Sequence, residues 1–195
     1  IMRGIVKPIL ISICIGLIIF IGFWGYVAAS LSGAFETFYS TQDLIENYNN
    51  KTVELIDLKN FVDENIPSNT TVEIEFEDDN LYILHIDNNY NWEQNIDSPK
   101  TDSLLQIIGW NKTKMTILKE KLKKANCISI KSGNPFNIGF QRSGMGKYFY
   151  NLFNEPIDEN NRNNFNDSCK YILLNDKVVL EYGGGAVGPK CFPKN

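Results

Sequence analysis

The run from Arg142 to Lys147, RSGMGK, is the local grouping of residue types in this chain that best suits an anion. The backbone amides of a glycine turn, flanked by two cations, can surround phosphate or carboxylate oxygens. A phosphate-binding P-loop would need a glycine at Gln141, a serine or threonine at Tyr148 and a helix afterwards, whereas the residues after Lys147 read as a strand. We therefore expect a glycine hairpin turn. Its candidate anion- or ligand-binding residues are Arg142, Ser143, Gly144 and Lys147.

Groups that could perform catalysis are few. The chain has a single histidine, His85, in the apolar run LYILHID, where a histidine is usually structural. A nucleophilic cysteine would need a base or another group that lowers the pKa of its thiol, and no spacing brings His85 near Cys127. The remaining local pair is Ser143 with Lys147. The sequence therefore favours a binding protein over an enzyme, and leaves a small envelope hydrolase with a carboxylate or Ser/Lys site as the alternative.

Acidic side chains form two patterns that resemble sites. Residues 71–77, TVEIEFE, place three glutamates on one face of a predicted strand, with Cβ atoms about 7 Å apart. Two such carboxylates can serve as the acid and base of a glycosidase, but alternating acids on a strand usually form a solvated face, which is what we expect here. Residues 87–98 begin like a calcium loop, yet Trp92 stands where that loop requires glycine. The sequence therefore predicts no metal site and no cofactor.

Residues 9–29, ILISICIGLIIFIGFWGYVAA, are 21 consecutive residues without a charge. A helix of that length reaches about 30 Å, the thickness of a bilayer core. Arg3 and Lys7 precede this segment, and the first charges after it are acidic. The positive-inside rule then places residues 1–8 in the cytoplasm, residues 9–29 across the membrane and residues 30–195 outside the cytoplasm.

A cleavable signal peptide is the alternative for this segment. Val27 and Ala29 would suit positions −3 and −1 of a cleavage site, but the apolar run is longer than a usual signal core and carries Trp24 and Tyr26 in the cleavage region. No later stretch approaches the roughly 18 apolar residues of a second span. We therefore expect a single-pass protein of a bacterial inner membrane, anchored in the lipid bilayer, with its domain facing the periplasm.

Three cysteines follow the apolar segment, and that topology places them in an oxidising compartment. A tight turn at Asn175-Asp176 would bring Cys169 beside Tyr182, nine residues before Cys191. The intervening glycine-rich residues can fold back, because glycine adopts backbone conformations that other residues avoid. We predict a disulfide between Cys169 and Cys191, and a buried free thiol at Cys127.

Two amphipathic helices are predicted after the apolar segment. The first begins with a capping-box pattern at Ser40 and repeats apolar residues at three- and four-residue steps until Pro67. The second begins at Ser98, a good cap followed by proline, and runs to about Asn126 with lysines on its outer face. We expect the lysines to be solvated.

Strand patterns occupy most of the remaining chain. Residues 71–77 and 81–87 alternate and read as a hairpin. After the second helix, short runs rich in β-branched and aromatic residues alternate with turn residues, and a polar loop spans residues 154–168. These runs are residues 127–131, 136–141, 147–153, 170–174 and 177–182. The order predicts an α+β class, with one domain of a mainly antiparallel β-sheet and two amphipathic helices on one face.

Charge and size limit the function further. The chain has 19 basic and 23 acidic residues, and residues 1–30 hold two of the basic ones and none of the acidic ones. Residues 31–195 therefore carry 17 basic and 23 acidic side chains, an acidic balance that argues against nucleic acid as a partner. We expect a binding module that contacts a protein partner in the cell envelope. A third possibility, after the hydrolase, is a membrane-bound inhibitor or immunity-type protein.

Overall fold

The computed structural model describes residues 2–31, 37–91, 95–184 and 191–193 of the 195-residue chain, with side chains in those ranges except at residues 2–13, 31 and 91. The helices in this part are α1 (Met2–Leu31), α2 (Thr41–Asn65), α3 (Pro99–Ile107), α4 (Lys112–Lys124) and α5 (Glu159–Arg162), with a short 3-10 turn η1 (Asn163–Phe165). The strands are β1 (Val72–Glu77), β2 (Asn80–Ile86), β3 (Asn89–Asn91), β4 (Ser129–Lys131), β5 (Phe136–Ser143), β6 (Gly146–Leu152), β7 (Tyr171–Asn175) and β8 (Val178–Gly183).

All eight strands form one antiparallel sheet in the order β3-β2-β1-β4-β5-β6-β8-β7. This confirms the predicted α+β class and the antiparallel sheet. Strand β3 lies within residues 87–98, the segment that begins like a calcium loop and for which no strand was predicted. The last turn is shifted by one residue, because the ladder is irregular between Leu173 and Asn175, and Asn175 pairs with Val178. The turn residues are therefore Asp176 and Lys177.

Helix α2 begins and ends where the sequence predicted. Ser40 and Asp43 form a complete capping box, and the helix ends at Asn65, with Ile66 as its C-cap before Pro67. The predicted apolar face is interrupted at Lys51, where the backbone leaves helical geometry (φ −125°, ψ 17°). The kink rotates one half of the helix relative to the other, so the fully buried residues do not follow a single unbroken stripe. They are Leu44, Leu55, Leu58 and Val62.

The second predicted helix is two helices, α3 and α4, and the prediction of one helix to Asn126 was wrong. Gly109 has a positive φ of 66°, a conformation that ends α3 and that glycine adopts without strain. Asn111 then caps α4 by accepting a hydrogen bond from the Lys114 amide at 3.0 Å. Between the two helices, Trp110 is buried and its indole N–H donates to the Asn65 carbonyl at 2.8 Å.

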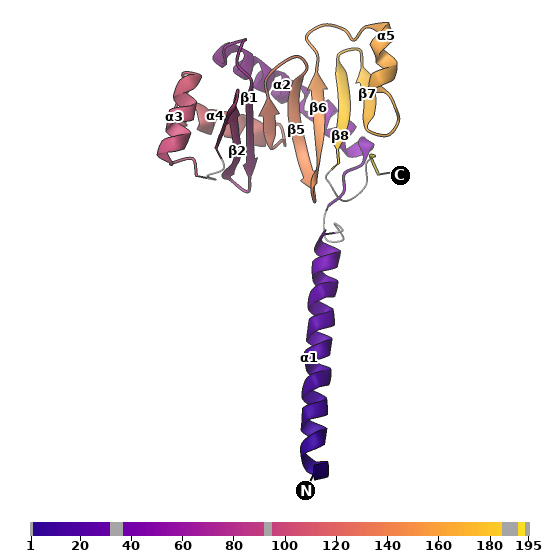
Figure 1. The fold of residues 1–195 in the computed structure, drawn as a ribbon. Coiled ribbons are helices and arrows are strands. Elements are labelled where there is room, and N and C mark those ends of the chain that lie inside the picture. Colours follow the sequence, from indigo (N-terminus) through magenta and orange to yellow (C-terminus); the bar gives the residue numbers. More distant parts are fainter. Residues whose placement is uncertain (1, 32–36, 92–94, 185–190, 194–195) are drawn as a thin grey trace.

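The main core lies between the sheet and helices α2, α3 and α4, which pack on one face, as predicted (Figure 1). Large aromatic side chains of β6 fill much of it, and Tyr148 and Tyr150 are fully buried. The Tyr150 hydroxyl donates to the Leu44 carbonyl at 3.0 Å and accepts from the Asn47 amide at 3.1 Å. The polar ends of the buried rings are thus paired with α2, which fixes the helix on the sheet.

Helix α1 stands apart from the sheet (Figure 1). Its described side chains, from Cys14 to Ser30, are mostly exposed, including Ile18, Phe20 and Trp24. Among the residues with described side chains, no helix has the length and apolar character needed to cross a membrane. The predicted span also includes residues 9–13, whose side chains lie outside that described part.

Candidate functional site

The face of the sheet opposite α2, α3 and α4, called the free face below, carries a row of polar and aromatic side chains. Strand pairing places one member directly opposite the next from β3 to β6, and hydrogen bonds continue the row to β7. We call this set the polar row. Its members are Tyr90, His85, Glu73, Lys131, Asn137, Asn151, Glu181 and Tyr171.

The second half of the polar row, from β5 to β7, is held by side-chain hydrogen bonds. The Asn137 amide donates to the Asn151 side-chain oxygen, and the Asn151 amide donates in turn to Glu181 at 2.9 Å. The Tyr171 hydroxyl and the Lys170 ammonium also bind the Glu181 carboxylate, at 3.3 and 3.2 Å. Four strands are thus linked through their side chains, so these groups hold one another in fixed positions.

The first half of the polar row, from β3 to β4, has looser contacts. The rings of His85 and Tyr90 stack with their centroids 3.8 Å apart, which agrees with a structural role for the histidine. Lys131 lies 3.8 Å from the Glu73 carboxylate, at the outer limit of an ion pair. This half has more exposed charge and more freedom to change partners.

Next to the polar row lies a buried charge cluster centred on Glu75. The expectation that Glu75 faces water was wrong, since its side chain is 0% exposed. One carboxylate oxygen accepts from Arg142 Nε and the other from Lys147 Nζ at 2.6 Å, and Lys147 also donates to Ser129 Oγ at 3.0 Å. Two cations from β5 and β6 therefore surround one carboxylate from β1.

A glycine makes room for this charge cluster. Gly139 pairs with Ser129 across β4 and β5, and a Cβ at that position would lie 2.0 Å from Ser129 Oγ. Any side chain there would displace the hydroxyl that Lys147 binds. Gly139 is visible in the sequence, but the need for a glycine there follows from its pairing with Ser129. Sequence patterns did not show that strand register.

The two cations respond differently to burial. Loss of water lowers the pKa of Lys147, although the Glu75 carboxylate partly opposes this effect. Burial also works against the charge of Arg142, but the hydrogen bond to Glu75 and the attraction of nearby negative charges, that of Glu75 first, together raise the pKa of Arg142. Aromatic rings flank both groups, with Tyr82 centred 5.2 Å from the guanidinium and Phe149 centred 4.8 Å from the ammonium.

The predicted glycine turn joins β5 to β6 through Gly144, with φ of 55°, and Met145. The structure brings together two of the four candidate residues, Arg142 and Lys147, which pair across the ladder and share Glu75. Ser143 is buried away from them beside the Tyr148 hydroxyl, so Ser143 and Lys147 do not form a Ser/Lys pair. The serine that Lys147 contacts is Ser129.

Two cavities lie away from the charge cluster. One of about 460 Å³ lies between the β1–β2 turn and the end of α4, and one of about 450 Å³ lies by the loops after α2 and β4. Neither is lined by Glu75, Lys147 or Ser129. Neither cavity therefore gives a substrate a route to these three residues.

The lysines of α4 are largely paired with acids of neighbouring elements. Lys119 and Lys123 both contact the Asp79 carboxylate, at 3.0 and 2.6 Å, and these hydrogen bonds lower the pKa of Asp79, with Lys123 contributing most. Lys121 reaches Asp57 of α2. The expectation that all of these lysines are solvated was therefore wrong for Lys119 and Lys121, which are 22% and 21% exposed, whereas Lys123 is 53% exposed. All three link α4 to the β1–β2 turn or to α2.

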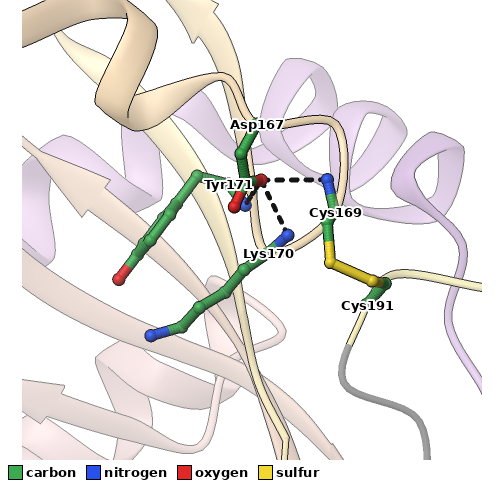
Figure 2. The surroundings of a disulfide bond; sticks show 5 residues. All are labelled: Asp167, Cys169, Lys170, Tyr171 and Cys191. Carbon is green, nitrogen blue, oxygen red and sulfur yellow. Dashed lines mark hydrogen bonds between the residues drawn. A yellow bond between two sulfur atoms is a disulfide. The ribbon is translucent and has the colours of Figure 1, made fainter.

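The predicted disulfide is present. Cys169 and Cys191 are bonded, with their Cα atoms 4.4 Å apart and a sequence separation of 22 positions (Figure 2). Asp167 organises the adjoining turn, because one of its carboxylate oxygens accepts the backbone amides of Cys169, Lys170 and Tyr171 at 2.8 to 2.9 Å (Figure 2). These bonds, that of Tyr171 first, lower the pKa of Asp167.

The other predictions for the cysteines can be compared directly. Cys127 is a buried free thiol, as predicted, and burial strongly raises its pKa. That environment is the opposite of what a nucleophilic cysteine needs. Sequence analysis did not predict the role of Asp167. An aspartate side chain often accepts the backbone amide two residues later, as Asp167 does from Cys169.

Among the described residues, no group of three or more histidines, cysteines or acids could hold a metal ion. Comparison of the chain with models of protein families, with curated proteins and with solved structures found no match.

Proposed function

We propose that this chain is a single-pass membrane protein whose extracytoplasmic domain binds a partner protein through the free face. In this proposal residues 9–29 are the anchor and residues 30–195 form an interaction module in a bacterial envelope. The polar row is the observation that carries the binding half of the proposal. The charge pattern around the apolar segment carries the anchoring half.

Support for the anchor comes from continuity and charge. Helix α1 is an unbroken helix of 30 residues, which at 1.5 Å per residue is about 45 Å long, close to the full thickness of a bilayer. Its 21 uncharged residues follow Arg3 and Lys7, and Trp24 and Tyr26 lie near the other end, where aromatic rings favour the headgroup region. A helix that exposes large apolar side chains such as Ile18 and Phe20 is stabilised by an apolar surrounding.

Support for a protein partner comes from the residues of the free face and its size. Tyrosine and arginine are enriched where protein interfaces are strongest, and both occur here, in Tyr171, Tyr82 and Arg142. Eight strands spaced about 4.8 Å apart give a face about 34 Å wide, and those strands that are five to eight residues long make it about 20 Å high, with Phe165 of η1 packed on Tyr171 at the β7 edge. The resulting area is close to the roughly 800 Å² per partner of a standard interface.

The alternative of a small hydrolase has less support. Lys147 and Ser129 lie within hydrogen-bonding distance, but Glu75 binds the ammonium as well and all three side chains are buried. Burial lowers the pKa of Lys147, as a lysine base requires, but the Glu75 carboxylate holds the ammonium in an ion pair and neither cavity is lined by these residues. The third possibility, an inhibitor or immunity-type protein, is a special case of the binding proposal with one tight cognate partner.

Site-specific photo-crosslinking in membranes tests the binding proposal. A photoreactive amino acid replaces Lys131, at the centre of the polar row, in the full-length protein, and a matched control replaces Val53, which is 77% exposed on α2. We expect a discrete crosslinked product from position 131 and none from position 53. Crosslinking from position 53 alone would place the partner on the helical side and overturn the proposal.

A further inference from the structure

We propose that one end of the domain rests on the membrane surface, with Met145 and Phe38 in contact with lipid. This end contains residues 37–40, the β5–β6 turn and residues 191–193, and we call it the basal end. The proposal rests on the proposed function, because the lipid is that of the membrane in which residues 9–29 are anchored. It adds an orientation of the domain and a second lipid-binding surface.

Chain length sets how far the basal end can lie from the anchor. Five residues separate Leu31, the end of α1, from Thr37. A chain advances at most about 3.5 Å per residue, so the Cα atoms of Leu31 and Thr37 are within about 21 Å of each other. The interfacial region of a bilayer is about 5 to 8 Å thick on each side. Residues 37–40 are therefore confined near the outer membrane surface in every orientation of the domain.

Contacts within the domain fix which end lies there. The Tyr39 amide donates to the Tyr148 hydroxyl at 3.2 Å, and the Tyr39 ring packs against Tyr148 and Phe140 at centroid distances of 5.6 and 5.2 Å. Tyr148 is the third residue of β6, directly after the β5–β6 turn. The point where the chain enters the domain is thus held beside that turn. The opposite end of the sheet therefore lies farther from the membrane than the basal end does.

The C-terminal tail packs against the same residue, Tyr148. Phe192 is buried, its ring lies 5.8 Å from that of Tyr148, and its amide donates to the Cys169 carbonyl at 2.9 Å. The disulfide between Cys169 and Cys191 holds the tail in this position. Figure 1 shows the β5–β6 turn, the C-terminal tail and the segment before α2 at the end of the sheet that is nearer to α1.

Apolar side chains are exposed at the basal end. Met145 is 56% exposed at the tip of the β5–β6 turn, and Phe38 is 44% exposed one residue before the docked Tyr39. The two-residue turn at the other end of the sheet, between β7 and β8, holds Asp176 and Lys177 instead. A flexible methionine and an aromatic ring suit the boundary between headgroups and acyl chains, whereas an aspartate and a lysine suit water.

Charges at the basal end permit this contact. Strands β1 and β5 run in the same direction, so the acidic β1–β2 turn lies at the same end of the sheet as the β5–β6 turn. Its Asp79 is paired with both Lys119 and Lys123, and with the exposed Glu77 and Asp78 the three acids and two lysines carry one net negative charge. A neutral, zwitterionic lipid surface therefore meets no strong repulsion. The strands then stand end-on to the membrane and the free face is open to the side.

Depth-dependent fluorescence quenching tests this orientation. The full-length protein carries an environment-sensitive fluorescent amino acid in place of Met145, or in place of Asp176 as the matched turn at the opposite end. Each variant is reconstituted in phosphatidylcholine vesicles with and without doxyl-labelled phosphatidylcholine. Because both positions are exposed turn residues, both variants should fold, and circular dichroism checks this.

We expect doxyl lipid to quench the reporter at position 145 at least twofold more than the reporter at position 176, with emission at position 145 shifted to shorter wavelength. Equal quenching at the two positions, in protein that floats with the vesicles, overturns the orientation and leaves the anchor intact. Protein that does not float with the vesicles overturns the anchor, and with it this inference.

Discussion

The two faces of the sheet bury side chains by different means. On the helical side, Leu58 of α2 and Ile74 of β1 are completely buried among apolar neighbours. On the free face, Glu75 is equally buried, but its surroundings are the cations of Arg142 and Lys147. The first face gains its stability from apolar area removed from water, and the second depends on a balance of charges. The same degree of burial therefore predicts different responses to mutation.

The largest expected effect is on the charge cluster. Glu75→Gln leaves two partly or fully buried cations without their counter-charge, and breaking a buried pair in this way costs about 3 to 5 kcal/mol of the free energy of unfolding. Denaturant titration of the protein in detergent measures the loss. A triple variant, Glu75→Leu with Arg142→Leu and Lys147→Met, should recover most of it. If the triple variant is no more stable than Glu75→Gln, charge balance does not explain the stability of this face.

A core truncation on the helical side should cost somewhat less. Leu58→Ala removes a fully buried side chain from α2, and the expected loss in the free energy of unfolding is about 3 kcal/mol, the lower middle of the range for such changes. The matched control is Val53→Ala on the exposed side of the same helix. Similar losses in both variants would show that α2 does not pack on the sheet as described.

Reduction of the disulfide should have a comparable or smaller effect. The bond closes a loop between residues that are 22 apart in number, for which chain entropy predicts a loss of about 3 kcal/mol in the free energy of unfolding. Reduction also frees Phe192 to leave the aromatic rings of Tyr148 and Tyr182. Thermal unfolding with and without dithiothreitol measures the change, and the Cys169→Ala, Cys191→Ala double variant should lose its sensitivity to dithiothreitol.

Asp167 should give a small dependence of stability on pH. Its pKa is lowered in the folded protein by the backbone amides that it accepts, that of Tyr171 first. Because the folded pKa is below the unfolded value, the contribution is present above about pH 4 and is lost as pH falls through the folded pKa. Asp167→Asn should flatten this acid limb of the stability curve. An unchanged acid limb would mean that other carboxylates account for it.

The smallest effect on stability should accompany a clear effect on binding. Lys131 is 52% exposed on the free face, and Lys131→Ala should change the free energy of unfolding by less than about 0.5 kcal/mol, as for most surface changes. Partner recovery from solubilised membranes should fall severalfold. If recovery is unchanged for Lys131→Ala and for Tyr171→Ala, the free face is not the binding surface.

Features that depend on neighbours in sequence were the ones that could be predicted. Alternation in residues 71–77, the cap at Ser40 and the spacing of Cys169 and Cys191 each describe a local preference or a short closure, and the structure confirms the strand, the helix start and the disulfide. Gly109 was visible in the sequence, but the periodic apolar residues on both sides of it concealed the break between α3 and α4.

Features that depend on strand register could not be predicted. Glu75 sits on the polar side of an alternating strand, and only the pairing of β1 with β4, of β4 with β5 and of β5 with β6 brings Arg142 and Lys147 to it. The polar row has the same origin, since Asn137, Asn151 and Glu181 are widely separated in sequence. Alternation reports which side chains share a face, but it does not report which strands are neighbours.

The contact between Tyr39 and Tyr148 has a mechanical consequence. If residues 9–29 hold the protein in a membrane while the free face holds a partner, any tension between the two passes through Tyr39. From there it enters β6, which is paired along its length with β5 on one side and β8 on the other. Force would therefore reach the sheet at an interior strand and would not peel off an edge strand such as β3 or β7.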